Sequence, residues 1–241
     1  MKQELWYINL NGCYDKQLLQ QYVIKAQKHD IQKIVLLEKD VQFIEFSCMY
    51  DELYHTYPQQ KQIFSDKRLC SIQTYCDFIT EMKQIDTNSI VKFGISIQYL
   101  PQYEQYIKRI IENTNFDAVF GEILCIDNMV FDVEELSNHM LWKKYSHTFL
   151  YRRYFELVYA MITSQLFDGM IGLDRIYQVG YSMPKDIERL YSKISRKLMM
   201  HHMGVYLYNQ DIVDKRLEKI FSYYKVETYQ LVNMTYNLEN G

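Results

Sequence analysis

Short apolar runs alternate along the chain with longer segments in which apolar residues recur every three or four positions. Runs such as 33–38 (KIVLLE) and 90–99 (IVKFGISIQY) predict buried strands, whereas the spacing in 15–29 predicts an amphipathic helix. Apolar and polar residues do not alternate cleanly in the strand runs, which is typical of parallel strands that are covered on both faces. The predicted strands are 5–9, 33–38, 90–99, 116–125, 169–174, 205–209 and 226–232.

Every predicted strand except the last precedes a helical pattern. The expected helices are 15–29, 69–82, 101–113, 144–166, 184–201 and 211–225, and segments 40–68 and 126–142 are predicted to be irregular. In 144–166 the residues expected to face inward are Phe149, Tyr154, Leu157, Val158 and Met161. The β-then-α order predicts an α/β fold, either an open doubly wound sheet or a closed barrel. Because no linker, repeat or low-complexity segment interrupts it, we expect residues 1–241 to form one domain.

Composition and charge narrow the class of protein. The 241 residues are 48% hydrophobic and 24% charged, which is typical of a globular chain and excludes wholesale disorder. The formal net charge of −3 provides no overall positive field, so neither nucleic acid nor a membrane surface is expected as a partner. No apolar stretch reaches the ~18 residues of a membrane span, and no secretory signal is visible. The five cysteines include no C-x-x-C pair, and we expect a cytoplasmic protein with reduced thiols.

Glycine-rich phosphate loops are missing from the sequence. It has eight glycines and contains neither G-x-G-x-x-G nor G-x-x-x-x-G-K-[ST], which excludes the common nucleotide-binding loops. In an α/β barrel, functional groups gather at the C-terminal ends of the strands. The positions predicted at those ends are 9–11, 38–40, 96–98, 124, 172–174, 209 and 233.

The middle of the chain carries a family resemblance. Its motifs are VKFGISIQYLPQYEQYIKRII, FDAVFGEILCID and LYRRYFELVYAMITSQLFDGMIGLD, all within 91–174. These motifs resemble the histidinol-phosphatase branch of the PHP (polymerase and histidinol phosphatase) superfamily, and the resemblance runs in order from about Trp6 to Asn209. It implies a distorted (βα)7 barrel of the TIM-like type. It also implies a metal cluster at the barrel mouth, held by His, Asp and Glu, that activates water against a phosphomonoester.

The same resemblance implies that most of the metal ligands are replaced in this chain. In the first half of the chain, the family's H-x-H motif matches Asn9 and Asn11, its E-H motif matches Glu38 and Lys39, and its metal-bridging Glu matches Ser96. In the second half, a His of the family matches Leu124, the His and Asp of H-x-D match Gly172 and Asp174, and the Asp and His of D-x-H match Asn233 and Thr235. Only Glu38 and Asp174 keep the family's residue. We therefore expect a degenerate member of the family.

Coordination chemistry turns this mapping into an expectation about function. A zinc or transition-metal ion needs three or four ionisable N, O or S ligands at ~2.0–2.3 Å, whereas an amide is a weak donor and an alkyl group donates nothing. We therefore expect no cofactor, no catalytic residue and no phosphatase activity. Glu38 and Asp174 could together hold one hard cation such as Mg²⁺, but an ion pair with Lys39 is the favoured interpretation.

Two classes of function stay open. The first is a pseudoenzyme that binds a small molecule or a protein partner, with the aromatic segment 43–64 and the insertion 126–142 as recognition surfaces. The second is a histidinol-phosphate phosphatase of the histidine biosynthesis pathway with a rebuilt Mn, Zn, Fe or Mg site. Arg153 is a candidate phosphate ligand, with a solvated helix face as the alternative. The other reactive side chains are expected to be structural, including His201, His202, Cys13, Cys48 and Cys125.

Overall fold

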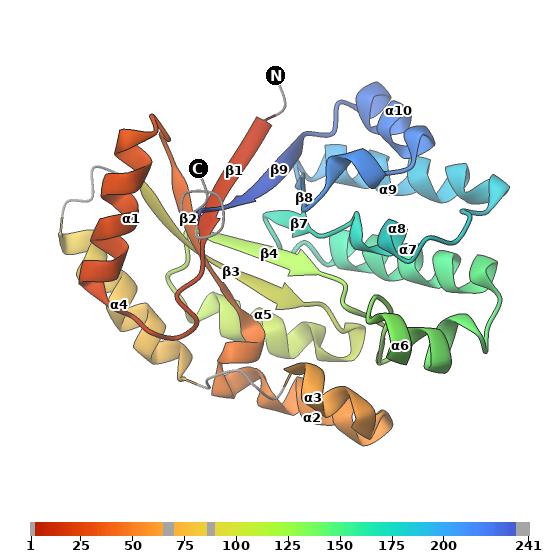
Figure 1. Ribbon diagram of the computed structural model, residues 1–241, viewed down its shortest axis with the longest axis horizontal. Coiled ribbons are helices and arrows are strands. Elements are labelled where there is room, and N and C mark those ends of the chain that lie inside the picture. The colour runs from red at the N-terminus through yellow and green to blue at the C-terminus, as the bar shows by residue number, and fades with distance from the viewer. Residues whose placement is uncertain (1–2, 65–69, 86–89, 235–241) are drawn as a thin grey trace.

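Seven parallel strands close into a barrel in the computed structural model, which describes residues 3–64, 70–85 and 90–234 (Figure 1). Neighbouring strands follow each other in chain order around the barrel, and the last pairs with the first, with Asn233 opposite Tyr7. The strands are β1 (Gln3–Ile8), β2 (Ile34–Lys39), β3 (Val91–Gln98), β4 (Ala118–Glu122), β7 (Gly169–Ile171), β8 (Gly204–Leu207) and β9 (Thr228–Asn233). All seven predicted strands are confirmed, and the closed barrel replaces the alternative of an open sheet.

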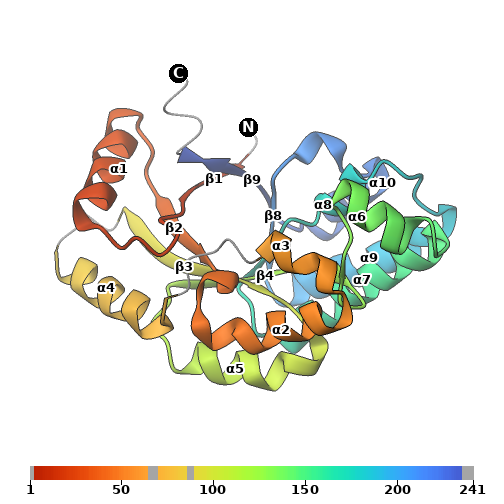
Figure 2. The same cartoon turned by 60° about the horizontal axis from the view of Figure 1, so that its bottom comes forward.

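Helices connect the strands on the outside of the barrel, and one follows each strand except the last. They are α1 (Lys16–Lys28), α4 (Ile72–Gln84), α5 (Glu104–Glu112), α7 (His147–Ser164), α9 (Glu188–Met200) and α10 (Lys215–Tyr224). Several begin at a side-chain cap, such as Asp15, which accepts hydrogen bonds from the amides of Gln17 and Leu18. The described helices leave the outer side of β1 and β9 open, and the residues of these two strands are the least buried of the barrel (Figure 2). The prediction that residues 1–241 form one domain stays a prediction.

The two segments predicted to be irregular are largely ordered. The first contains α2 (Ser47–Thr56) and α3 (Lys61–Phe64), and the second contains a hairpin of β5 (Cys125–Ile126) and β6 (Met129–Val130), then α6 (Glu134–Ser137) and a π-helical turn (Asn138–Trp142). These elements are too short to show a clear period in the sequence. The segments also contact each other, because the buried amide of Gln60 donates to the Asn128 carbonyl and accepts from the Val130 amide.

One prediction about the long helix α7 is wrong. Phe149 does not face inward, because it lies in the first turn of the helix and is 48% exposed. The four other residues predicted for the inner face are buried.

The barrel interior is separate from the main core between strands and helices. Its apolar centre contains Val35, Leu37, Phe120, Ile171 and Leu231. The ring of Tyr206 also enters it, and a Cβ on Gly169 would lie 2.6 Å from this ring, which explains glycine there. Because successive side chains in a strand point to opposite faces, this set fixes which residues at the strand ends point into the mouth of the barrel.

Candidate functional site

Adjacent residues at the end of β2 point in opposite directions. Val35 and Leu37 face the barrel interior, so Lys39 continues the inner row and lines a pocket at the mouth. Glu38 lies on the outer side, fully buried, near Tyr14 and Tyr75 of the helical layer. Of the two residues matched to the family's E-H pair, only the lysine therefore reaches the mouth.

We call this hollow at the C-terminal ends of β2, β3 and β4 the mouth pocket. Its volume is about 160 Å³. One side is apolar and includes Val41, Ile63, Phe64 and Leu124, while the polar groups are Lys39, Asp40, Tyr50, Ser96, Gln98, Glu122 and Arg175. The strands supply Lys39, Ser96, Gln98 and Glu122, because parallel strands of a barrel present their C-terminal ends on one face, whereas Tyr50 comes from α2.

Asp40 joins β2 to β3 at the base of the pocket. One carboxylate oxygen accepts hydrogen bonds from the Tyr50 hydroxyl (2.7 Å) and the Val41 amide (2.8 Å), and the other accepts from the Gln98 amide (3.0 Å). Burial raises the pKa of Asp40 to about 7, against the lowering effect of these hydrogen bonds. The carboxylate is therefore occupied in holding the pocket together.

Gln98 and Glu122 stand opposite each other on β3 and β4. The side-chain oxygen of Gln98 accepts from the Leu124 amide (2.7 Å), but its Nε2 has no hydrogen-bond partner among the described residues. The Oε1 of Glu122 is likewise buried without a partner there, and its Oε2 is 3.7 Å from Arg175. Two residues that line the mouth pocket thus each have a buried polar atom without a partner among the described residues.

Arg175 is the arginine of the mouth, at the start of α8 (Arg175–Gln178). Its guanidinium lies 2.6 Å from the Asp132 carboxylate. Burial lowers the pKa of this guanidinium, but the carboxylates of Asp132 and Glu122 raise it by more, so the pKa of Arg175 is raised overall. Arg153, the predicted phosphate ligand, instead lies on the surface of α7 and pairs with Asp127 (2.7 Å) and Glu156 (3.4 Å). The sequence offered a signal for Arg175, which directly follows the matched Asp174.

The positions of the family's H-x-H motif form an amide cluster. Gln42 Nε2 donates to the side-chain oxygens of Asn9 (3.2 Å) and Asn11 (3.0 Å), and Asn9 Nδ2 donates to the Leu37 carbonyl (2.8 Å). Asn11 has a φ of 52°, a conformation that asparagine tolerates better than most residues. Sequence reasoning missed Gln42, because nothing local in segment 40–68 marks it.

Glu38 and Asp174 do not form a carboxylate pair. Glu38 Oε1 accepts from the Leu10 amide (2.8 Å), whereas Asp174 accepts from the amides of Tyr208 (3.1 Å) and Asn209 (2.7 Å) beyond β8. Burial raises the pKa of both carboxyls, to about 7 for Glu38. Each carboxylate thus accepts hydrogen bonds from backbone amides near it in space. The two are also separated in the sheet, because β3 and β4 lie between β2, which contains Glu38, and β7, which precedes Asp174.

The other matched positions are at the same end of the barrel. Ser96 and Leu124 line the mouth pocket, and Gly172 has a φ of 74° just after β7. Asn233 ends β9, where its Nδ2 is 3.4 Å from the Tyr7 hydroxyl, whereas Thr235 lies outside the described residues.

The residues at the mouth do not fit the family's metal cluster. Among the described residues, no group of three or more His, Cys, Asp or Glu is placed to hold a metal ion. The oxygens of Asn9, Asn11 and Asp40 already accept hydrogen bonds, which a metal ion would have to displace. Cys125 and His201 offer no replacement, because Cys125 is buried with a raised thiol pKa and His201 follows the end of α9.

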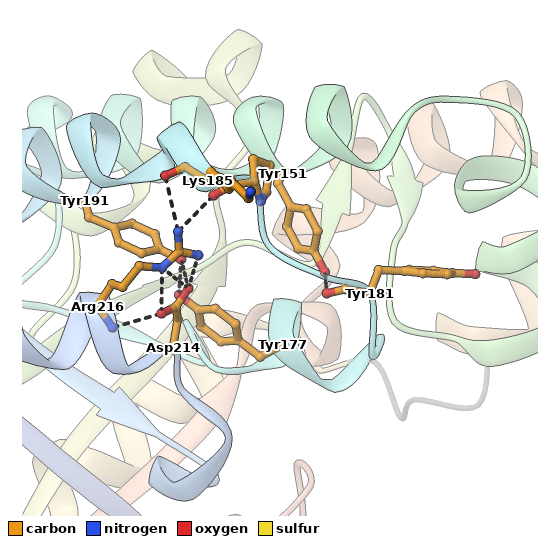
Figure 3. Close-up of polar contacts among 8 residues, drawn as sticks. Tyr151, Tyr177, Tyr181, Lys185, Tyr191, Asp214 and Arg216 are labelled. Carbon is orange, nitrogen blue, oxygen red and sulfur yellow. Dashed lines mark hydrogen bonds and ion pairs between the residues drawn. The ribbon is translucent and has the colours of Figure 1, made fainter.

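A larger cavity of about 430 Å³ lies beside the mouth, between the insertion and the segment after α8. Trp142, Tyr181 and Asp132 line this cavity, and the ring centroids of Trp142 and Tyr181 are 5.2 Å apart. The segment that carries Tyr181 is held by Tyr151, which donates to the Tyr181 carbonyl, and by Arg216, which donates to the carbonyls of Pro184 and Lys185 (Figure 3). Asp132 therefore connects this cavity to Arg175 and the mouth pocket.

Similarity to one solved structure supports the fold defined here, a TIM-like α/β barrel. The histidinol phosphate phosphatase of Lactococcus lactis subsp. lactis Il1403, solved with zinc, L-histidinol and phosphate, is similar with a TM-score of 0.56 and 14% identity; the match covers 95% of this chain and 87% of that one. An HpcH/HpaI aldolase from Desulfitobacterium hafniense DCB-2 has a TM-score of 0.43 and 9% identity, over 99% and 89% of the two chains.

At the level of sequence, no protein-family model and no curated protein matches the chain. The similarity to the phosphatase is thus a similarity of fold. Within the described residues, no helix combines the length and the apolar character needed to cross a membrane.

Proposed function

We propose that this protein is a pseudoenzyme of the histidinol-phosphatase type, a barrel that binds a small polar ligand at its mouth and does not hydrolyse phosphomonoesters. The amide cluster carries the proposal. Where the family has histidines that bind metal, Asn9 and Asn11 are hydrogen-bonded to Gln42, and Lys39 adds a cation. Without a metal ion there is no Lewis acid and no water of lowered pKa to attack phosphorus.

The mouth pocket supports the binding part of the proposal. Proteins rarely leave polar groups buried without a partner, and such groups in a concave site are candidates for ligand contacts. Gln98 and Glu122 both have such a group, and they lie at the barrel face where related folds bind their ligands. We further propose that the protein works in the cytoplasm as one domain.

A metal-dependent histidinol-phosphate phosphatase is the second candidate. Two observations favour it, the phosphatase fold of the similar structure and the presence of two buried carboxyls, Asp40 and Glu122, in one pocket. Such an enzyme would have to bind Mn, Zn, Fe or Mg through groups that are hydrogen-bonded to the protein in the present structure.

Metal content and turnover separate the two candidates. The purified protein is expected to hold no stoichiometric Mn, Fe or Zn and to hydrolyse histidinol phosphate or p-nitrophenyl phosphate at the background rate, with or without added metal. The phosphatase from Lactococcus lactis, assayed in parallel, serves as the positive control. Metal-dependent turnover above about 1 s⁻¹, the low end for enzymes, that is lost in Asp40→Asn or Glu122→Gln overturns the proposal.

A further inference from the structure

Two residues that line the mouth pocket carry one hydrogen-bond donor and one acceptor that the described part of the protein leaves unused. Gln98 is 1% exposed and Glu122 is 4% exposed, and both side chains line the pocket. They are directly opposite residues of adjacent parallel strands, so their side chains leave the sheet on the same face. The spacing between neighbouring strands is ~4.8 Å, which one small molecule can bridge.

The bonds that these side chains do make fix which atoms remain available. Because Gln98 Oε1 accepts from the Leu124 amide, its Nε2 is the atom left as a donor without a partner among the described residues. Glu122 is held on its other oxygen by Arg175, so Oε1 is the acceptor. A complementary ligand must accept one hydrogen bond and donate another within a short distance, which a hydroxyl group does with a single oxygen.

Charge around the pocket disfavours an ionic ligand. An anion such as a phosphate ester would meet the free oxygen of Glu122, and Arg175 is already paired with Asp132 at 2.6 Å. A cation would meet Arg175 and Lys39 in the same wall. A neutral polar molecule avoids both repulsions, and the apolar side formed by Val41 and Phe64 accommodates its C–H groups.

Building on the proposed function, we propose that the ligand of the mouth pocket is a small neutral hydroxylated compound, of the polyol or monosaccharide class. Its hydroxyl groups accept from Gln98 Nε2 and donate to Glu122 Oε1. Ser96 supplies a further hydroxyl that can donate or accept. The volume of about 160 Å³ limits the enclosed part to a few carbon and oxygen atoms.

The side-chain amide of Gln98 reports directly on this contact. In a ¹⁵N-labelled protein, its NH₂ signals are assigned by their loss in Gln98→Met. The protein is then titrated separately with glycerol, D-ribose, inorganic phosphate, acetate and methylammonium. We expect the Gln98 amide signals to shift and saturate with glycerol or D-ribose but not with the ions.

Variants locate the acceptor side of the contact. Glu122→Met should weaken polyol binding about tenfold, the loss expected for one hydrogen bond of about 1.4 kcal/mol, and Gln98→Met, which removes the donor instead, should weaken it as much and covers a failure of the first variant to fold. Glu112→Met on the exposed side of α5 is the matched control and should leave binding unchanged.

The remaining outcomes decide against the ligand class. Saturation with phosphate, acetate or methylammonium alone shows an ionic ligand, and no saturable shift with any probe means that water alone fills the pocket. Either result overturns this inference but leaves the absence of phosphatase activity untouched. Metal-dependent turnover, in contrast, overturns the proposed function whatever the titrations show.

Discussion

Glu38 and Lys39, neighbours in sequence, have side chains on opposite faces of β2. Glu38 is buried under the helical layer, where its Oε1 accepts from the Leu10 amide, while Lys39 lines the mouth pocket. The alternation of side chains along a strand thus places Glu38 away from the mouth, although it is the residue that matches the glutamate of the E-H motif. The consequence is that Glu38 accepts a hydrogen bond from the segment after β1 and does not line the mouth pocket.

Removing the carboxylate of Asp40 should strongly destabilise the fold. Asp40→Ala leaves the Tyr50 hydroxyl and the amides of Val41 and Gln98 without their acceptor, and we expect a loss of about 3 kcal/mol in the free energy of unfolding. Urea unfolding measures it. Asp51→Ala, an exposed carboxylate of α2, is the control and should stay within about 0.5 kcal/mol of the wild type. Equal effects of the two variants would contradict the assigned role.

Glu38 should make stability depend on pH. Its pKa is raised from 4.5 to about 7 in the folded protein, so the folded state binds the proton more tightly than the unfolded state does. Its contribution to stability is therefore complete below pH 4.5 and is lost as the pH rises through about 7. Relative to Glu38→Gln, the wild type should lose about 3 kcal/mol over this range.

Chemical unfolding at several pH values tests the Glu38 prediction. Glutamine keeps an acceptor for the Leu10 amide and cannot titrate. Glu112→Gln, on the surface of α5, should retain the wild-type pH profile. Parallel profiles for the wild type and Glu38→Gln would show that the Glu38 carboxyl has an ordinary pKa.

Replacing Arg175 should destabilise the protein more than replacing Arg153. Arg175→Met leaves the buried carboxylates of Asp132 and Glu122 without their cation, and we expect a loss of about 3–5 kcal/mol. Arg153→Met removes only exposed ion pairs and should cost less than about 1 kcal/mol. Thermal and urea unfolding of both variants measure the difference. A small effect at Arg175 would mean that its carboxylates are solvated.

Introducing metal ligands at the positions matched to the histidinol-phosphatase motifs should create metal binding. The triple variant Asn9→His, Asn11→His and Ser96→Glu places ionisable ligands at three matched positions, and histidine is among the residues that adopt the left-handed conformation of position 11. The variant is expected to retain zinc after dialysis, measured by elemental analysis, whereas the wild type is not. A folded variant without zinc would refute the match between these positions and the family motif. Activity is not expected, because supporting hydrogen bonds also matter.

Local patterns predicted much of the fold and part of the site. Hydrophobic periodicity located all seven strands, because burial on both faces leaves a signal within each run. It did not separate β5 and β6 from a loop, since two-residue strands are shorter than any period. Strand-end reasoning pointed to Gln98, but the sequence could not show that its amide opposes Glu122 of another strand.

The amino-acid sequence by itself determined the order of strands and helices, the presence of asparagine at positions 9 and 11, and the near-neutral charge of the chain. The tertiary structure alone decided that Gln42 bonds both asparagines, that Arg175 rather than Arg153 lies at the mouth, and that Glu38 faces the helices. The physical reason is the range of the interactions. The hydrophobic pattern that predicts a strand or helix lies within a few neighbouring residues. The site, in contrast, forms only when barrel closure and strand register bring distant side chains together.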